Sequence, residues 1–192
     1  MEVEAIACDR KRRRKINICL GYRKDEQIRV VLRNMVVSDV ELLGELLFGS
    51  ARVLDGSRLE DDELIELATV TFTEKPFCVV RQWMLLDVML PEFQEQEVKA
   101  QGLEATVLYA QAVVFDSSKN LHSGDSVLSD FQSDFENCIF ESKDVLYILA
   151  GRGARKHVSA PAVEALRAFK NADVNERVAK AALHESLPGL AS

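Results

Sequence analysis

Residues 77–86 read Phe-Cys-Val-Val-Arg-Gln-Trp-Met-Leu-Leu, a run rich in β-branched, aromatic and other apolar side chains. The apolar residues stand at odd and even positions alike, whereas a strand with one face in water alternates between apolar and polar residues. Two arrangements produce such a run: a strand buried on both faces, or a strand that bends between two environments. Both arrangements predict a long strand here.

Three further strands are predicted downstream, at residues 105–115, 137–142 and 144–150. Phe140 and Tyr147 are so close in sequence that the strands carrying them must form a hairpin, and a hairpin pairs its strands antiparallel. The sequence therefore predicts a mainly antiparallel sheet of about four to six strands, for which a partly open barrel is one possible form.

Helices flank this sheet in the sequence. Ser38 and Glu41 have the spacing of a capping box, and Gly49 is a typical C-terminal signal, so a helix is predicted over this segment. Pro91 and Gly102 bound a mostly polar helix in a similar way. Other helices are predicted at residues 60–68, 159–169 and 173–185. The predicted fold class is α+β, with helices before and after the sheet.

One main domain is the expectation for a chain of 192 residues that is 47% apolar. We divide the chain into a basic N-terminal segment (residues 1–37), a main α+β domain (38–170) and a C-terminal helix with a tail (171–192). The apolar runs are too short to span a bilayer, and no secretion signal pattern is found, so no membrane partner is expected. The four scattered cysteines fit a cytoplasmic location, where thiols stay reduced.

The charge of the chain is segregated along the sequence. Residues 1–34 hold 10 Lys and Arg against 5 Asp and Glu, residues 35–150 hold 7 against 22, and residues 151–192 hold 7 against 4. The two ends are therefore basic and the middle is strongly acidic. Segregation of this kind constrains partners through the sign of the field that each region presents, but it specifies no chemistry.

Two basic stretches are candidate contacts for an anion or a nucleic acid. One is the run of adjacent cations Arg10, Lys11, Arg12, Arg13, Arg14 and Lys15. The other is residues 151–156, Gly-Arg-Gly-Ala-Arg-Lys, predicted as a strand-to-helix loop in which Arg152, Arg155 and Lys156 supply charge. The alternative for residues 10–15 is that they dock on the acidic middle of this chain or of another copy. The alternative for residues 151–156 is a tight turn whose cations are only solvated.

No motif for nucleophilic catalysis, metal binding or a cofactor is found. The cysteines and histidines lack the spacing of metal ligands, so neither a metal nor a cofactor is predicted. Asp116, Asp125, Glu141 and Asp144 fall at strand ends or turns, where paired carboxylates could act as acid and base, although Asp is also an ordinary turn former. An enzyme with a site near Asp125 and Gly151 is one alternative, and a non-enzymatic role is favoured.

Residues 77–169 carry an ordered series of short motifs. These include Cys-Val-Val-Arg-x-Trp from Cys78, Val-x-Tyr-Ala from Val107, Gly-Asp from Gly124, Phe-Glu-Ser from Phe140 and Gly-x-Gly-x-Arg-Lys from Gly151. The series resembles an uncharacterised bacterial domain family of hypothetical proteins. The chain departs from that family's pattern at Ser126 and at Lys143-Asp144. The resemblance implies a bacterial source and no particular function.

The favoured function is a non-enzymatic protein-interaction module. A regulator or inhibitor of a nucleic-acid machine is one form of it, because an acidic middle can compete for basic surfaces. Glu60, Asp61, Asp62 and Glu63 form the predicted contact patch. Another protein is the expected partner, and nucleic acid and a second copy of the chain in a homo-oligomer are the other candidates. The alternative function is a nucleic-acid-binding protein that uses the two basic stretches.

Overall fold

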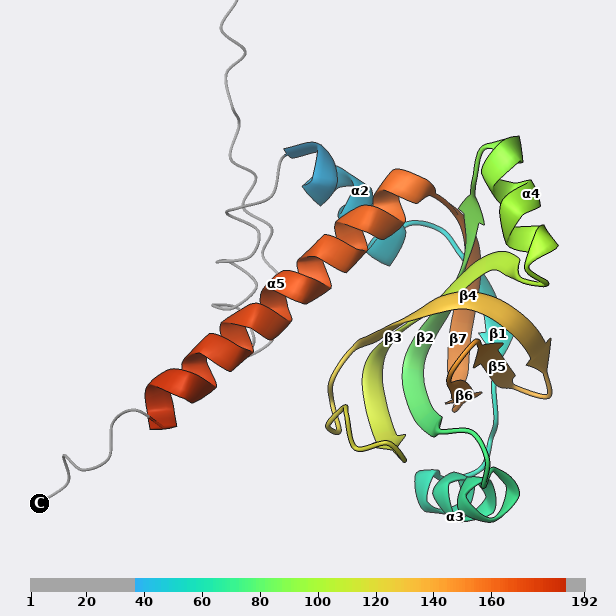
Figure 1. The fold of residues 1–192 in the computed structure, drawn as a ribbon, viewed down its shortest axis with the longest axis vertical. Coiled ribbons are helices and arrows are strands. Elements are labelled where there is room, and N and C mark those ends of the chain that lie inside the picture. The colour runs from blue at the N-terminus through green and yellow to red at the C-terminus, as the bar shows by residue number, and fades with distance from the viewer. Residues whose placement is uncertain (1–36, 186–192) are drawn as a thin grey trace, which may run out of the picture.

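The computed structural model describes the backbone of residues 37–185 and the side chains of residues 38–172. An antiparallel meander is formed by the strands β2 (Phe77–Met89), β3 (Glu104–Asp116), β4 (Val127–Glu136), β5 (Ile139–Ser142) and β6 (Leu146–Leu149). In a meander with an odd number of strands the first and last run in the same direction. Parallel pairing of β6 with the first half of β2 accordingly closes this meander into a barrel (Figure 1).

Two more strands extend the sheet from β2. The strand β7 (Arg152–Ser159) runs parallel to the second half of β2, and β1 (Arg52–Asp55) pairs antiparallel with the other side of β7. One side of β2 is thus lined by β3, and the other side is lined first by β6 and then by β7. Gly151 joins β6 to β7 with a φ of 68°, a left-handed conformation that glycine adopts without strain.

The inward face of β2 changes at Gln82. This residue has a φ of 53° within an otherwise extended strand. Before it, the side chains of Cys78 and Val80 lie in the barrel core, and after it those of Trp83 and Leu85 do, so the inward positions change from even to odd numbers. The strand is therefore buried on both faces and also changes its environment along its length, which explains why the sequence of β2 does not alternate.

Four helices surround the sheet in the part of the chain that the structure describes. The helices α2 (Val37–Phe48) and α5 (Ala160–Glu185) pack together over the outer face of the second half of β2, and α3 (Asp61–Thr71) covers the outer face of its first half (Figure 1). The short helix α4 (Glu92–Ala100) connects β2 to β3 and buries only Val98. None of the helices in the described part of the chain has the length and apolar character needed to cross a membrane.

The predicted fold class is confirmed: the chain is α+β, its sheet is mainly antiparallel, and part of that sheet forms a barrel. The predicted hairpin is also confirmed, because Phe140 of β5 stands opposite Tyr147 of β6. The sheet has seven strands, which is more than the four to six predicted. Three of these strands, β1, β4 and β7, were not expected.

Two predictions of local structure are wrong. Residues 151–156 are not a loop before a helix, because residues from Arg152 onward form β7, which is held by pairing with both β2 and β1. The two predicted C-terminal helices are one continuous helix, α5. Nothing in residues 170–173 breaks a helix, since Lys-Asn-Ala-Asp contains neither glycine nor proline.

Candidate functional site

A half-buried carboxylate joins three neighbouring strands. Asp87 of β2 has a side chain that is only 18% exposed. Its two oxygens each accept a hydrogen bond of 2.9 Å from Arg155 of β7, and its Oδ1 also accepts one of 2.9 Å from the hydroxyl of Thr106 on β3. The Nδ1 atom of His157 lies 3.9 Å from Asp87 Oδ2. We call these four residues the Asp87 cluster.

The negative charge of Asp87 is matched by the positive charge of Arg155. Burial by itself would raise the pKa of Asp87, but hydrogen bonds from Arg155 and Thr106 and the nearby positive charge outweigh it and lower that pKa. The same contact raises the pKa of Arg155. A bidentate guanidinium–carboxylate pair with a third donor leaves the carboxylate well satisfied. The cluster therefore fastens β3, β2 and β7 together.

Lys156, on the opposite face of β7, caps a helix. Its Nζ atom donates hydrogen bonds of 2.9, 2.8 and 3.1 Å to the backbone carbonyls of Glu45, Leu46 and Gly49. The first two carbonyls belong to the last turn of α2 and the third directly follows the helix, where a cation complements the helix dipole. Partial burial lowers the pKa of Lys156. The lysine thus connects α2 to the sheet.

The glycine at residue 153 is explained by packing. A Cβ atom built at Gly153 would overlap the six-membered ring of Trp83, so only glycine allows the indole to lie against β7. The indole Nε1 donates a hydrogen bond of 3.2 Å to the carbonyl of Ala150. Arg152 is exposed, with its Nε atom 3.4 Å from a carboxylate oxygen of Asp55. Contact of Arg152, Arg155 and Lys156 with an anion stays a prediction, and all three already have partners within the chain.

The structure does not describe the other predicted basic contact, the run of cations at residues 10–15. Within residues 38–172 the chain holds 12 Lys and Arg against 23 Asp and Glu. The described surface is therefore acidic overall.

The predicted acidic patch lies at the start of α3, and its members differ in role. Asp61 is turned toward the barrel, where its Oδ1 accepts a hydrogen bond of 2.8 Å from Nε of Arg81 on β2. The Nη2 atom of the same guanidinium lies 2.7 Å from this oxygen in an ion pair. Glu63 accepts a 3.1 Å hydrogen bond from the backbone N–H of Glu60 and so stabilises the first turn. Glu60, Asp62 and Glu63 are exposed. These three carboxylates, and not Asp61, are available to a partner.

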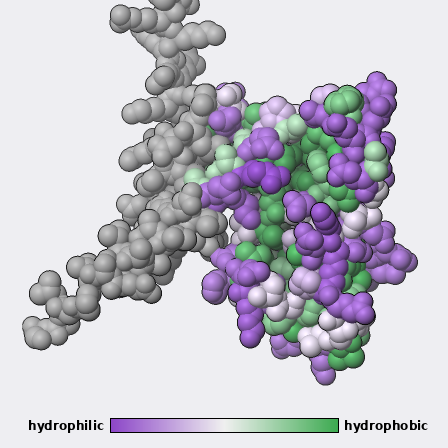
Figure 2. All heavy atoms as spheres, viewed as in Figure 1, coloured by the Kyte–Doolittle hydropathy of each residue, from purple (hydrophilic) through white to green (hydrophobic). Residues whose placement is uncertain are grey.

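The outward face of α3 carries a mixed stripe. Glu63, Glu66, Leu67 and Val70 follow one another at helical spacing i, i+3, i+4 and i+7, and all four are exposed. Leu67 is 56% exposed and Val70 is 76% exposed. We call these four residues the α3 stripe. It is acidic toward the start of the helix and apolar toward its end, and Figure 2 shows green apolar spheres at the end of the molecule where α3 lies.

Asp116 is held in its own turn. It is buried and accepts hydrogen bonds from the backbone N–H groups of Ser118, Asn120 and Leu121. Burial would raise the pKa of Asp116, but the hydrogen bonds outweigh burial and lower it. This residue has the local geometry of a turn-forming aspartate.

The remaining turn carboxylates are also locally bonded or exposed. Asp125 accepts a 2.9 Å hydrogen bond from the backbone N–H of His122, Glu141 pairs with Lys75 at 2.7 Å, and Asp144 is exposed. Among the described residues, no group of three or more His, Cys, Asp or Glu side chains could hold a metal ion. Two hollows lie on the described surface at other places, and neither is lined by Asp125 or Gly151.

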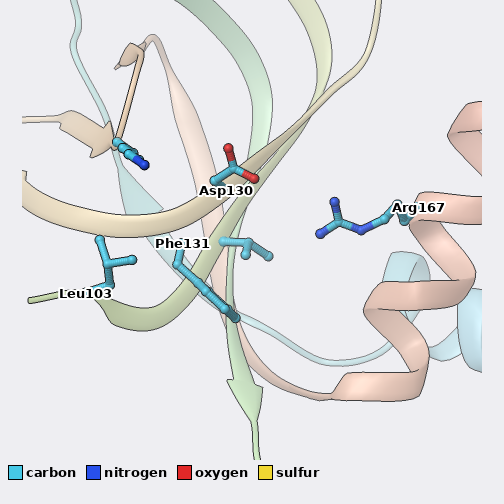
Figure 3. Close-up of a pocket in the computed structure, with 6 residues that line it drawn as sticks. Leu103, Asp130, Phe131 and Arg167 are labelled. Atoms are coloured by element: carbon cyan, nitrogen blue, oxygen red, sulfur yellow. The ribbon is translucent and has the colours of Figure 1, made fainter. Parts of the chain in front are cut away.

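The first of these hollows lies between α5 and the barrel, with a volume of about 230 Å³ (Figure 3). Its apolar lining comes from Leu103, Val107 and Phe131, and its charged lining from Asp130, Lys143 and Arg167. In Figure 3 the guanidinium of Arg167 reaches from α5 toward β4, which carries Asp130 and Phe131. We call this site the α5 hollow. The second hollow, about 290 Å³, lies between α2 and β7 beside Lys156.

Sequence reasoning did not identify the Asp87 cluster or the α5 hollow. Asp87 has one visible signal, because it is a charged residue directly after the apolar run at residues 77–86. The α5 hollow has none, since its six residues come from separate elements and share no motif.

Comparison with known proteins identifies the family of the chain. A family model described as "Domain of unknown function (DUF6957)" matches residues 55–165, a range that starts in β1, contains the whole barrel and ends within α5. No curated protein and no solved structure matches the chain. The match covers more than half of the 192 residues, so the expected membership of an uncharacterised domain family is confirmed. The chain belongs to the DUF6957 family of domains of unknown function.

Proposed function

We propose that this chain is a non-enzymatic protein-interaction module that binds a basic partner protein through the α3 stripe. The observation that carries the proposal is the exposure of Leu67 and Val70 on a helix whose opposite face, at Leu64 and Ala68, is buried. Exposed apolar side chains next to charged ones are a common composition of protein-binding surfaces.

The chemistry of the stripe specifies the kind of partner. A partner helix would complement the α3 stripe if its contact face carried Lys or Arg at one end and apolar residues at the other. Glu63 and Glu66 would face the basic residues, and Leu67 and Val70 would face the apolar ones. Asp62 and Glu60, which are exposed beside the stripe, would add to the attraction and speed association.

A regulator or inhibitor of a nucleic-acid machine is the finer form of this proposal. Proteins that bind nucleic acids present clusters of Lys and Arg to phosphates, and an acidic surface can occupy such clusters in place of the nucleic acid. The overall acidity of residues 38–172 supports this form. We place the activity in the bacterial cytoplasm, which is supported by the scattered cysteines and by the resemblance to a bacterial family.

The test is affinity purification of the full chain from its native host, with and without nuclease, followed by mass spectrometry. We expect a stoichiometric protein partner that survives nuclease and that is lost when Leu67→Ser and Val70→Ser are combined. The matched charge variants are Glu63→Gln with Glu66→Gln on α3 and Glu92→Gln with Glu97→Gln on α4. The first pair should weaken the complex, and the second pair should leave it unchanged.

The same purification also tests nucleic-acid binding. Recovery of nucleic acid without a protein partner, lost when the cations of residues 10–15 are replaced by Gln, would overturn the proposal in favour of the alternative. A protein partner that binds equally well to all three variants would show that the α3 stripe is the wrong surface.

A further inference from the structure

The α5 hollow combines an apolar floor with charges of both signs. Val107 is 2% exposed, and Leu103 and Phe131 are partly buried beside it, so the floor is apolar. Asp130 on β4, Lys143 in the turn between β5 and β6, and Arg167 on α5 stand around this floor. The hollow is thus bounded by two positive groups and one negative group.

These charges do not neutralise one another. Among the residues that the structure describes, none of the ion pairs joins Asp130 to Lys143 or to Arg167. Arg167 instead has its Nε atom 3.8 Å from a carboxylate oxygen of Glu164, one turn away on the same helix. Opposite charges that line one hollow without touching leave room for a ligand that carries the complementary charges itself.

We propose that the α5 hollow binds a free α-amino acid with an apolar side chain. Its carboxylate would face Arg167 and Lys143, its ammonium group would face Asp130, and its side chain would lie on Phe131. Arg suits a planar carboxylate because it can donate two parallel hydrogen bonds. Pockets for drug-sized molecules have volumes of roughly 300–1,000 Å³, so a hollow of about 230 Å³ suits a smaller ligand.

The arrangement disfavours other small ligands. Asp130 would repel a dicarboxylate or a phosphate ester that has no ammonium group to place beside it. A residue within a peptide lacks one or both of the charged groups of the free amino acid. This small-molecule site is distinct from the α3 stripe, so the two proposals are tested independently of each other.

The experiment is calorimetric titration of the full chain with L-leucine, L-phenylalanine, N-acetyl-leucine and leucine amide. Both free amino acids should bind with saturation. The acetylated analogue, which lacks the ammonium charge, and the amide, which lacks the carboxylate charge, should each bind about tenfold more weakly.

Two variants test which residue binds the ammonium group of the ligand and which binds its carboxylate. Asp130→Asn should weaken leucine about tenfold and should not weaken N-acetyl-leucine, because that analogue has no ammonium group to pair with Asp130. Arg167→Gln should weaken leucine to a similar extent and leave leucine amide unchanged. A purely structural role for either residue would weaken all the ligands alike. Asp134→Asn on β4 and Arg58→Gln before α3 are matched controls, and neither should change binding.

The proposal is overturned if neither free amino acid shows saturable binding in the millimolar range. It is also overturned if the two analogues bind as tightly as leucine, or if the Asp130 and Arg167 variants affect every ligand equally. Circular dichroism of each variant establishes that a loss of binding is not a loss of fold.

Discussion

The indole of Trp83 occupies the space that any side chain at Gly153 would need. The contact joins the strand that runs through the barrel to the strand added beside it, and Trp83 is 1% exposed. Gly153→Ala should therefore destabilise the fold by about 1–3 kcal/mol, the usual cost of overpacking a core. Urea unfolding followed by tryptophan fluorescence measures the change.

The matched control is Gly44→Ala in α2, where a Cβ atom meets nothing within 4 Å. Because alanine is a better helix former than glycine, this substitution should stabilise the protein by about 0.5–1 kcal/mol. Equal effects of the two substitutions would contradict the packing explanation for Gly153.

Asp87→Asn should lower the free energy of unfolding at neutral pH by about 1–3 kcal/mol, because it leaves Arg155 half-buried without its carboxylate. The folded protein lowers the pKa of Asp87. The ionised side chain therefore contributes its stability above the unfolded pKa of about 3.9, and the contribution is lost as pH falls through the lower, folded pKa. The difference between wild type and Asp87→Asn should accordingly shrink in acid, as denaturation curves at several pH values can test.

Lys156→Met should weaken the attachment of α2 to the sheet. The substitution removes the three hydrogen bonds to the C-terminal end of α2 and to Gly49 directly after it, and should cost about 1 kcal/mol. Hydrogen exchange of the amides near residues 46–49 should become faster. Lys119→Met, in an exposed turn, should leave this exchange unchanged; faster exchange in both variants would show that the cap is not responsible.

Gln82→Val should destabilise the fold by about 1–2 kcal/mol, because a β-branched residue is strained at a φ of 53°. Gln82→Gly should be tolerated, since glycine adopts this conformation readily. The comparison of the two variants by thermal unfolding isolates the backbone effect, because the side chain of Gln82 is exposed. A well-tolerated valine would mean that β2 can change its inward face without the left-handed residue.

Local signals in the sequence predicted the elements that local interactions specify. Gly49 directly follows α2, Pro91 and Gly102 bound α4, and the short separation of Phe140 from Tyr147 marks a hairpin. In each case the residues that form the signal are close enough in sequence to act without the rest of the fold. Ser38 is not the N-terminal cap that its spacing from Glu41 predicted, because α2 already begins at Val37.

Strands whose state depends on distant partners were missed. Residues 152–159, Arg-Gly-Ala-Arg-Lys-His-Val-Ser, have little intrinsic preference for a strand, and pairing with β2 and β1 determines their conformation. Residues 127–136 are largely polar because β4 has one face in water, so their strand signal is weak. The alternating faces of β7 also separate Arg155 from Lys156, which the loop prediction had placed together.

The double pairing of β2 has a consequence for synthesis. Its partners β6 and β7 leave the ribosome long after β2 does, so one hydrogen-bonding edge of an apolar strand stays open until nearly the whole domain has been made. A nascent chain that stops before β7 is complete cannot cover the whole of this edge with its native partners. Premature termination between β2 and the end of β7 should therefore yield aggregation-prone fragments and not a smaller folded domain.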